Sequence, residues 1–174
     1  MGNYPAELEE HWDSIGERLT IRPIRAGDEA AHAAFFHRLS PEDIRLRFFA
    51  AVRELTPAQL ARFTHPDYER DIALIAVRES TGETVGVARL ARNDVHAPAE
   101  FAVVVQADVK GKGLGTHLMQ KLIAWARQHD VPEIRGEVLA ENYNMLIFCR
   151  DLGFLLSHLP SDPEIVEVRL PLKG

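Results

Sequence analysis

A glycine-rich run in the second half of the chain has the composition of an anion-binding loop. The run consists of Lys110, Gly111, Lys112, Gly113, Leu114, Gly115 and Thr116. It follows an apolar stretch, Phe101 to Val105, and precedes residues with the spacing of an amphipathic helix. A glycine-rich turn that opens a helix leaves several backbone N–H groups unpaired at the positive end of the helix dipole. The run therefore predicts a site for a phosphate or pyrophosphate group.

The spacing of the glycines separates this loop from two other phosphate loops. A P-loop requires Ser or Thr directly after its Gly-Lys pair, but Lys112 is followed by Gly113. A dinucleotide-binding fingerprint requires a third glycine where this chain has Thr116, and it normally opens the first strand–turn–helix unit of a domain. A third interpretation, in which the glycines only permit a tight strand-to-helix turn, stays open.

The elements that position the loop follow from hydrophobic periodicity and from capping residues. Runs of apolar and β-branched residues predict strands at 19–24, 72–77, 84–90, 100–105, 134–139, 154–156 and 165–170. Helical periodicity predicts helices at 29–39, 41–50, 57–64, 142–152 and between the glycine-rich run and Val131. The expected N-caps are Asp28, Ser40, Thr56 and Asn142, and the expected C-cap of the last helix is Gly153.

These elements predict an α/β (α+β) fold with a mixed, mostly antiparallel central sheet of about seven strands. Short polar links join the strands up to residue 105, as in an antiparallel meander. The strand 100–105, the helix after the glycine-rich run and the strand 134–139 should instead form a right-handed parallel crossover.

The composition of the chain indicates one main domain. At 174 residues and 46% hydrophobic, the chain is long enough for a single well-buried domain, which we assign to residues 20–174. Residues 1–19 carry five acidic residues against one arginine and are predicted to be a solvated helix or arm. No apolar run reaches the ~20 residues that cross a bilayer, and no signal peptide is visible, so we expect a cytoplasmic protein without membrane contact.

Charge and metal-ligand spacing argue against two further kinds of partner. The net charge is −6, and no basic stripe is interleaved with aromatic residues, so nucleic-acid binding is not expected. The eight histidines and the single Cys149 are scattered rather than spaced as zinc ligands, so no metal is expected.

The glycine-rich run resembles a motif of the GNAT superfamily of N-acetyltransferases. Residues Lys110 to Gly115 are similar to the acetyl-CoA pyrophosphate motif of that family, with Lys110 in place of the usual Gln or Arg. The order of elements from Thr20 to Leu170 also matches the GNAT layout, so the resemblance covers nearly the whole chain. It implies a central sheet with helices on both faces.

A second GNAT motif is matched in part by the last predicted helix. In the family, an Asn begins this helix and a Gly-Phe pair closes it, and here these positions hold Asn142 and Gly153-Phe154. The family's small residue and tyrosine are replaced by Met145 and Cys149. Two of the four positions therefore differ from the family pattern.

Segments in the first half of the chain resemble Pat-type protein lysine acetyltransferases within the GNAT superfamily. These segments are Tyr4-Pro5, Ile21-Arg22-Pro23-Ile24, Leu39-Ser40-Pro41-Glu42 and Arg47-Phe48-Phe49. The resemblance implies that the acceptor is the side-chain amine of a protein lysine.

The GNAT resemblance implies that acetyl-CoA is the acyl donor and that main-chain groups hold most of it. Backbone groups of Val103, Val104 and Val105 are expected to pair with the pantetheine arm like an added strand. The N–H groups from Lys110 to Thr116 are expected to hold the pyrophosphate. Asn142 either hydrogen-bonds the pantetheine or only caps its helix, and both interpretations stay open.

Glu100 is the candidate general base. A free lysine amine has a pKa near ~10.4, so a base must take its proton before the amine attacks. Glu100 lies among Ala99, Phe101 and Ala102, an apolar setting expected to favour proton uptake, and it matches the general-base glutamate of Pat-type enzymes. The alternative is a strand-end glutamate that is exposed or paired with an arginine.

The general acid of the reaction is left unassigned. Many GNAT enzymes protonate the leaving thiolate with a tyrosine, and Cys149 takes that place here. A lone cysteine on the apolar side of a helix is expected to be a buried packing residue.

The predicted function is acetyl transfer from acetyl-CoA to a primary amine by direct attack, with a protein lysine as the expected acceptor. A small-molecule amine acetyltransferase would share every donor-site residue and is the first alternative. A non-catalytic acetyl-CoA sensor is the second alternative, because the tyrosine is missing at Cys149.

Overall fold

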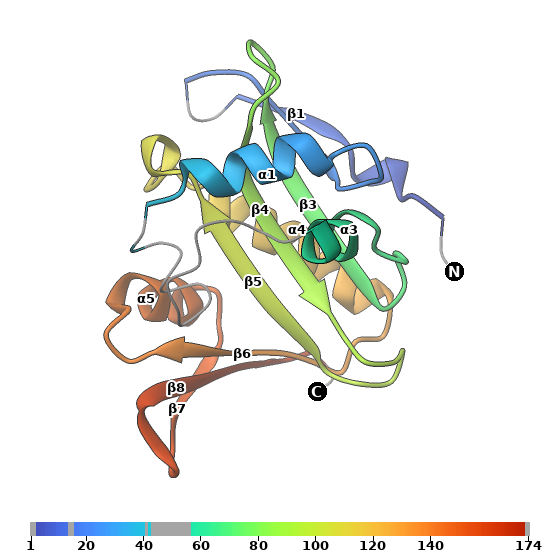
Figure 1. Cartoon of the computed structure of the whole chain (residues 1–174). Helices are drawn as coiled ribbons and strands as arrows, with labels where there is room; N and C mark the ends of the chain where they lie inside the picture. The colour runs from blue at the N-terminus through green and yellow to red at the C-terminus, as the bar shows by residue number, and fades with distance from the viewer. Residues whose placement is uncertain (1–2, 14–15, 41, 43–56, 173–174) are drawn as a thin grey trace.

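The computed structural model describes residues 3–13, 16–40, 42 and 57–172, which are arranged around one central sheet (Figure 1). The strands are β1 (Glu10–Trp12), β2 (Leu19–Pro23), β3 (Asp71–Arg78), β4 (Thr84–Ala91), β5 (Ala99–Val105), β6 (Glu133–Leu139), β7 (Leu155–Leu159) and β8 (Asp162–Pro171). The helices are α1 (Glu29–Arg38), α3 (Pro57–Thr64), α4 (Leu114–Gln128) and α5 (Tyr143–Asp151), with 3-10 helices η1 (Ala6–Leu8) and η2 (Ala107–Val109). Most of the helix predicted at 41–50, and the expected cap Thr56, lie outside the described residues.

The sheet is mixed and mostly antiparallel, which confirms the predicted fold class. Its strand order is β1-β2-β3-β4-β5-β6-β8-β7. Among the described strands, β5 and β6 form the only parallel pair, and α4 connects them as the predicted crossover. The sheet has eight strands rather than about seven, because residues 10–12 add β1 at its edge.

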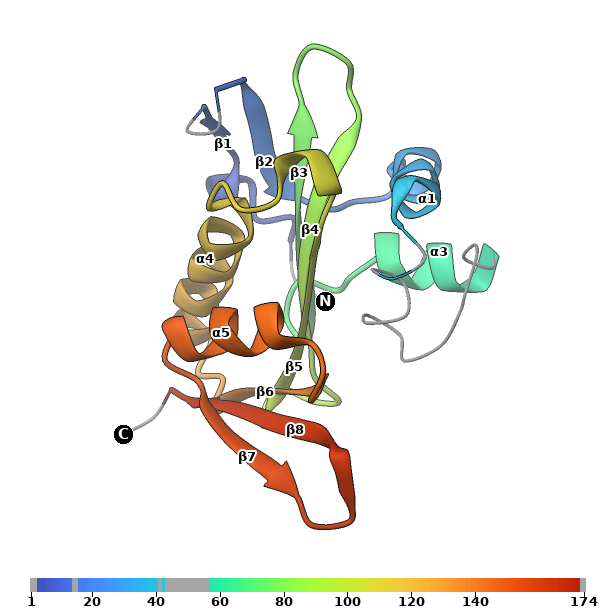
Figure 2. The ribbon, with the colours of Figure 1, turned by 90° about the vertical axis from the view of Figure 1, so that its left-hand side faces the viewer.

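Helices cover both faces of the sheet (Figure 2). On one face lie α4 and α5, and on the other lie α1 and α3. The apolar stripe of α4, which includes Leu118 and Leu122, packs on the sheet as the main core. A smaller core under α1 joins Phe35 and Phe36 to Val87 of β4. In the described part of the chain, no helix has the length and apolar character needed to span a bilayer.

The ends of α5 are as predicted, whereas Asp28 does not cap α1. The Asn142 side chain accepts a hydrogen bond from Met145 N–H at 3.3 Å, and Gly153 follows α5 with a φ of 101°. The Asp28 carboxylate makes no cap bond and instead accepts two hydrogen bonds from Arg22, at 2.9 and 2.7 Å. A bidentate bond to a guanidinium is stronger than a cap bond to a neutral N–H, so the ion pair determines where this carboxylate lies.

The acidic N-terminal segment is joined to the body of the protein through Glu10 on β1. Its carboxylate hydrogen-bonds to His117 and accepts a bond from Lys121 Nζ at 2.8 Å, and both partners lie on α4. Trp12 stacks on the His117 ring with the ring centroids 4.9 Å apart. The prediction of a solvated helix or arm is therefore wrong for residues 10–12, which form β1 and contact α4. The sequence alone did not indicate this contact, because His117 lies 107 residues further along the chain than Glu10.

The Glu10 contacts predict a pH-dependent contribution to stability. Burial raises the pKa of Glu10, but the hydrogen bonds from Lys121 and His117 outweigh it and hold the pKa below its usual 4.5. A lowered carboxyl pKa stabilises the fold fully above the usual value, and this stabilisation is lost as the pH falls through the folded-state pKa. We expect Glu10→Gln to lower the free energy of unfolding by about 1 kcal/mol at pH 7 and by progressively less below about pH 4.5.

Denaturant unfolding of the parent and of the Glu10→Gln variant between pH 3.5 and pH 7 measures this effect. The matched control is Glu7→Gln on the same segment, because Glu7 is an exposed residue of η1 and forms none of these contacts to α4. A stability difference that stays constant over this pH range would contradict the role given to Glu10.

Candidate functional site

β5 is paired along nearly its whole length on one edge and almost unpaired on the other. Its ladder with β4 runs from Glu100 to Val105, whereas its pairing with β6 is confined to Ala99 and Glu100. Beyond Glu100 the two parallel strands diverge and leave a gap between them, which we call the β5–β6 gap.

The main-chain groups of β5 that face the β5–β6 gap follow from the register. Gln106 N–H donates to Val85 O at 2.8 Å, so Gln106 points its peptide groups toward β4. Successive residues of an antiparallel strand alternate in this direction. The peptide groups of Val103 and Val105 therefore face the gap, whereas those of Val104 face β4. Three valines were predicted to pair with a ligand. Two of them, Val103 and Val105, have peptide groups that face the β5–β6 gap.

The glycine-rich run forms a loop that begins α4. Gly111 and Gly113 have φ values of 74° and 89°, a backbone conformation that is unfavourable for residues other than glycine. Gly113 is the N-cap residue of α4. The first helical hydrogen bond runs from His117 N–H to Gly113 O at 3.0 Å. Within the described residues, the N–H groups from Gly111 to Thr116 donate to no backbone carbonyl. They are therefore available to an anion at the positive end of the helix dipole.

The loop lies at the end of the β5–β6 gap. A Cβ at Gly115 would lie 3.6 Å from Val105 Cγ2 and 3.5 Å from the ring of Phe148 on α5. The start of α4, the end of β5 and α5 are therefore in contact. Lys110 and Lys112 are exposed on the loop and add positive charge there.

The two residues singled out on and before α5 have clear structural roles. Asn142 caps the helix and is partly exposed, so its side chain also borders solvent. Cys149 is fully buried, as predicted, and burial raises the pKa of its thiol to about 12. A thiol that is so weakly acidic and shielded from solvent is a poor proton donor.

Glu100 lies at the beginning of β5 with its side chain exposed. Among the described residues, the predicted apolar enclosure of this carboxylate is therefore not found. In the β5–β6 register Glu100 is opposite Arg135, yet among the described residues no ion pair joins them. Glu100 shares one face of β5 with Ala102 and Val104, since side chains alternate along a strand.

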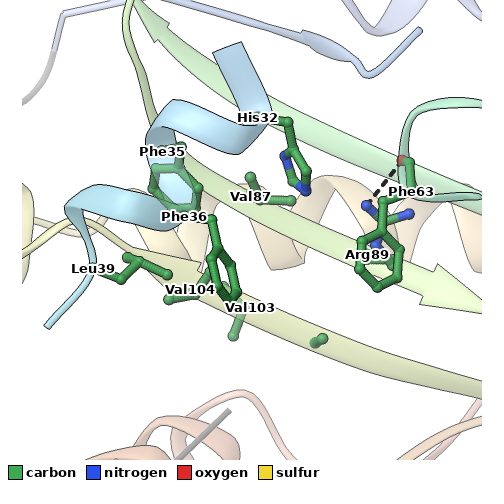
Figure 3. A pocket seen from close by; sticks show the side chains of 10 residues that line it. His32, Phe35, Phe36, Leu39, Phe63, Val87, Arg89, Val103 and Val104 are labelled. Carbon is green, nitrogen blue, oxygen red and sulfur yellow. Dashed lines mark hydrogen bonds between the residues drawn. The ribbon is translucent and has the colours of Figure 1, made fainter. Parts of the chain in front are cut away.

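The same face of β5 borders a small apolar pocket between the sheet and α1 (Figure 3). The pocket encloses about 40 Å³ and is lined by His32, Phe35, Phe36, Leu39, Phe63, Val87, Arg89, Ala102, Val103 and Val104. Arg89 is 9% exposed and donates to Phe63 O at 3.0 Å, with its guanidinium carbon 4.6 Å from the Phe63 ring centroid. The pocket therefore has apolar walls and one buried cation.

Sequence reasoning did not identify this pocket. The apolar residues of α1 were expected only to pack in the hydrophobic core. The pocket also needs α3 to pack against α1, and the sequence pattern of either helix does not predict that contact. One signal was present, since Arg89 is a charged residue inside the otherwise apolar run 84–90. A charge in a buried strand usually has a specific partner or function.

Comparison with known proteins identifies the family. Residues 36–154 match the model of the Acetyltransferase (GNAT) family. The Acetyltransferase Pat of Mycolicibacterium smegmatis is 28% identical over 170 residues, which cover 87% of this chain and 51% of that protein. The chain thus spans about half the length of this curated relative.

Solved structures agree with this family. The GNAT domain of S. lividans PAT has a TM-score of 0.88 and 27% identity, and the match covers 98% of this chain and 100% of that chain. The putative acetyltransferase yncA of Salmonella typhimurium, solved with its cofactor acetyl-CoA, has a TM-score of 0.71 and 20% identity over 89% of this chain and 94% of that chain. Because the family model matches more than half of the residues, the chain belongs to the GNAT family of acetyltransferases.

Proposed function

We propose that this chain transfers the acetyl group of acetyl-CoA to the side-chain amine of a protein lysine, with Glu100 as general base. One observation carries the proposal. The unpaired edge of β5 leads directly to the unpaired N–H groups at the start of α4, so a linear ligand with a phosphate at one end fits both.

The donor would be held mostly by main-chain groups. The pantetheine arm contains amides, and it would pair with the peptide groups of Val103 and Val105 like an added strand. One of these N–H groups would also polarise the thioester carbonyl as negative charge develops on its oxygen. Val104 would contribute through its side chain, which lines the pocket on the acceptor side.

The pyrophosphate would lie on the loop. Its oxygens would accept hydrogen bonds from the N–H groups between Gly111 and Thr116, with Lys110 and Lys112 supplying positive charge. Asn142 lies at the start of α5, the helix that contacts Gly115, and would meet the pantetheine with the part of its side chain that is exposed.

The acceptor would approach from the side of α1. The four methylene groups of a lysine side chain suit the apolar walls of the pocket, and Glu100 shares the strand face that forms one of these walls. Glu100 would take the proton from the ammonium, and the neutral amine would then attack the thioester carbon. The nitrogen would release its second proton to solvent as the carbon–sulfur bond breaks. The thiolate of coenzyme A would leave without a proton from Cys149, because that thiol is buried and weakly acidic.

The choice of a protein lysine rests on the resemblance to Pat-type enzymes and on the similarity to Acetyltransferase Pat. An assay of coenzyme A release over a panel of acceptors tests it. The panel holds folded proteins, including an acyl-CoA synthetase, lysine peptides, and small amines such as spermidine. We expect turnover with at least one protein at a rate 10-fold or more above every small amine, with mass spectrometry locating the acetyl group on lysine.

Two results of this assay would contradict the proposal in different ways. Turnover only with small amines would contradict the protein lysine as acceptor, while the proposed acetyl transfer to an amine would stand. Tight binding of acetyl-CoA without turnover on any amine would identify a non-catalytic acetyl-CoA-binding module.

A further inference from the structure

A second cavity lies at the end of α4 that is remote from the glycine-rich loop. It has a volume of about 430 Å³, which is in the range of small-molecule sites. Its walls come from the N-terminal segment, from the segments that flank the β3–β4 hairpin and from the last turn of α4. We call it the α4-end cavity. α4 has 15 residues, so its length separates this cavity from the loop by roughly 20 Å.

Arg92 places a buried positive charge in the wall of the α4-end cavity. Its side chain is only 9% exposed, and its Nη1 and Nη2 donate to Val95 O at 2.8 Å and to Glu69 O at 2.7 Å. Both acceptors are neutral carbonyls. Among the described residues, no carboxylate forms an ion pair with Arg92, and its Nε–H has no hydrogen-bond partner.

A buried guanidinium stays charged, and such a charge normally has an anionic partner. The Trp125 ring, whose centroid is 6.0 Å from the Arg92 guanidinium carbon, and the negative end of the α4 dipole carry only partial charge. They therefore compensate Arg92 in part. The charge that remains favours an anion in the cavity beside it.

Aromatic rings form much of the remaining wall. The buried Trp125 stacks on His129 with the ring centroids 4.2 Å apart, and Tyr4 meets Tyr68 edge to face at 5.7 Å. Both tyrosine hydroxyls donate hydrogen bonds to other groups of the protein, which keeps the rings in place. Such walls suit a flat apolar group.

Two carboxylates, Glu7 and Glu69, also line the α4-end cavity. Both residues are exposed, so water and salt screen their charges far more than that of Arg92. An anion is therefore favoured on the side of the cavity that Arg92 forms.

We propose that the α4-end cavity is a binding site for a small aromatic carboxylate, separate from the site proposed for acetyl-CoA. The carboxylate pairs with Arg92 through the N–H donors that the two carbonyls do not use, since a guanidinium has five. The ring of the ligand lies against the aromatic side chains. This inference does not depend on the proposed acetyl transfer.

Titration with benzoate, followed by NMR, tests the proposal. The chain has two tryptophans, so Trp12→Phe assigns the remaining indole N–H signal to Trp125. We expect benzoate to shift this signal with a Kd of about 1 mM or lower. Benzamide has the ring without the charge, and inorganic phosphate has the charge without the ring. Each should bind at least 10-fold more weakly than benzoate, and saturating acetyl-CoA should leave the Kd for benzoate unchanged.

Two positions test the role of Arg92. Arg92→Gln removes the charge and should weaken benzoate binding at least 10-fold. Val95 is 44% exposed and lines the cavity, and its bond to Arg92 uses the main chain. Val95→Glu should therefore weaken benzoate binding at least 10-fold by offering Arg92 a competing carboxylate, whereas the matched Val95→Gln should keep the parent Kd. If Arg92→Gln does not fold, the Val95 pair decides alone.

Several results would overturn the proposal. These are a Trp125 signal that does not respond to benzoate, equal affinity for benzoate and benzamide, and parent affinity for benzoate in Val95→Glu. Binding of phosphate as tightly as benzoate would remove the role of the aromatic walls. Displacement of benzoate by acetyl-CoA would contradict a separate site.

Discussion

Replacing Glu100 by Gln is expected to lower kcat by about 100-fold or more near neutral pH and to leave the affinity for acetyl-CoA unchanged. The amide has the shape of the carboxylate but cannot take the proton that the lysine ammonium must lose before the amine attacks. Glu100 lies at the beginning of β5, whereas the proposed donor contacts begin at Val103, so the substitution should affect proton transfer alone. Measuring kcat between pH 6 and pH 9, together with calorimetric titration of acetyl-CoA, checks both parts of this expectation.

Glu7→Gln is the matched control for this variant, because Glu7 is an exposed carboxylate on η1, which contacts β2 near the opposite edge of the sheet from the proposed site. It should retain the parent kcat. Equal activity of the Glu100→Gln variant and the parent across the whole pH range would remove Glu100 from the mechanism. The remaining interpretation of this residue would then be an exposed carboxylate at the end of a strand.

Replacing Gly113 by Ala is expected to raise the Kd for acetyl-CoA about 10-fold or more. Gly113 has a φ of 89°, and a residue with a side chain pays about 1–2 kcal/mol to adopt this conformation. The loop would relieve this strain by rotating its peptide groups, which turns the N–H groups at the start of α4 away from the phosphate. A 10-fold change corresponds to about 1.4 kcal/mol, which is within this range. Calorimetric titration of acetyl-CoA measures it.

The chain provides a close control for the strain itself. Gly82, in the turn between β3 and β4, has a φ of 77°, and a Cβ at either Gly82 or Gly113 would meet no atom within 4 Å. Gly82→Ala should therefore lower the melting temperature to a similar degree and leave the Kd for acetyl-CoA at the parent value. If both variants weakened binding equally, the effect of Gly113→Ala would reflect general destabilisation and the loop would lose its assigned role.

Elements governed by local patterns were predicted well. The change from strand periodicity to helical periodicity after Gly113, the cap at Asn142 and the positive φ at Gly153 all depend on residues within a few positions of one another. Asp28 was predicted wrongly because two interactions competed for one carboxylate. A guanidinium six residues earlier in the chain is a stronger partner than the helix N–H groups, and no capping pattern includes it.

The candidate site also combines features that local sequence patterns predict with features that depend on tertiary contacts. The loop from Lys110 to Thr116 and the strand that precedes it are contiguous, so their composition and spacing predicted an anion site next to a strand. The exposure of Glu100 depends on which side chains surround it in space, and the pocket under α1 depends on β4, α1 and α3 meeting. Strand β1 was missed because three residues carry too little periodicity, and the side-chain partners of its Glu10 lie on α4.

The amino-acid sequence by itself determined the family, the mixed sheet with its parallel crossover, and the loop proposed for the pyrophosphate, because each is encoded in short-range patterns of residue type. Only the tertiary structure decided that β5 and β6 separate after Glu100, and that Val103 and Val105 are the valines whose peptide groups face the gap. The physical reason is that register and strand separation depend on contacts between distant parts of the chain, such as the pairing of Glu100 with Arg135. These two residues are far apart in the chain and meet only when the sheet has formed.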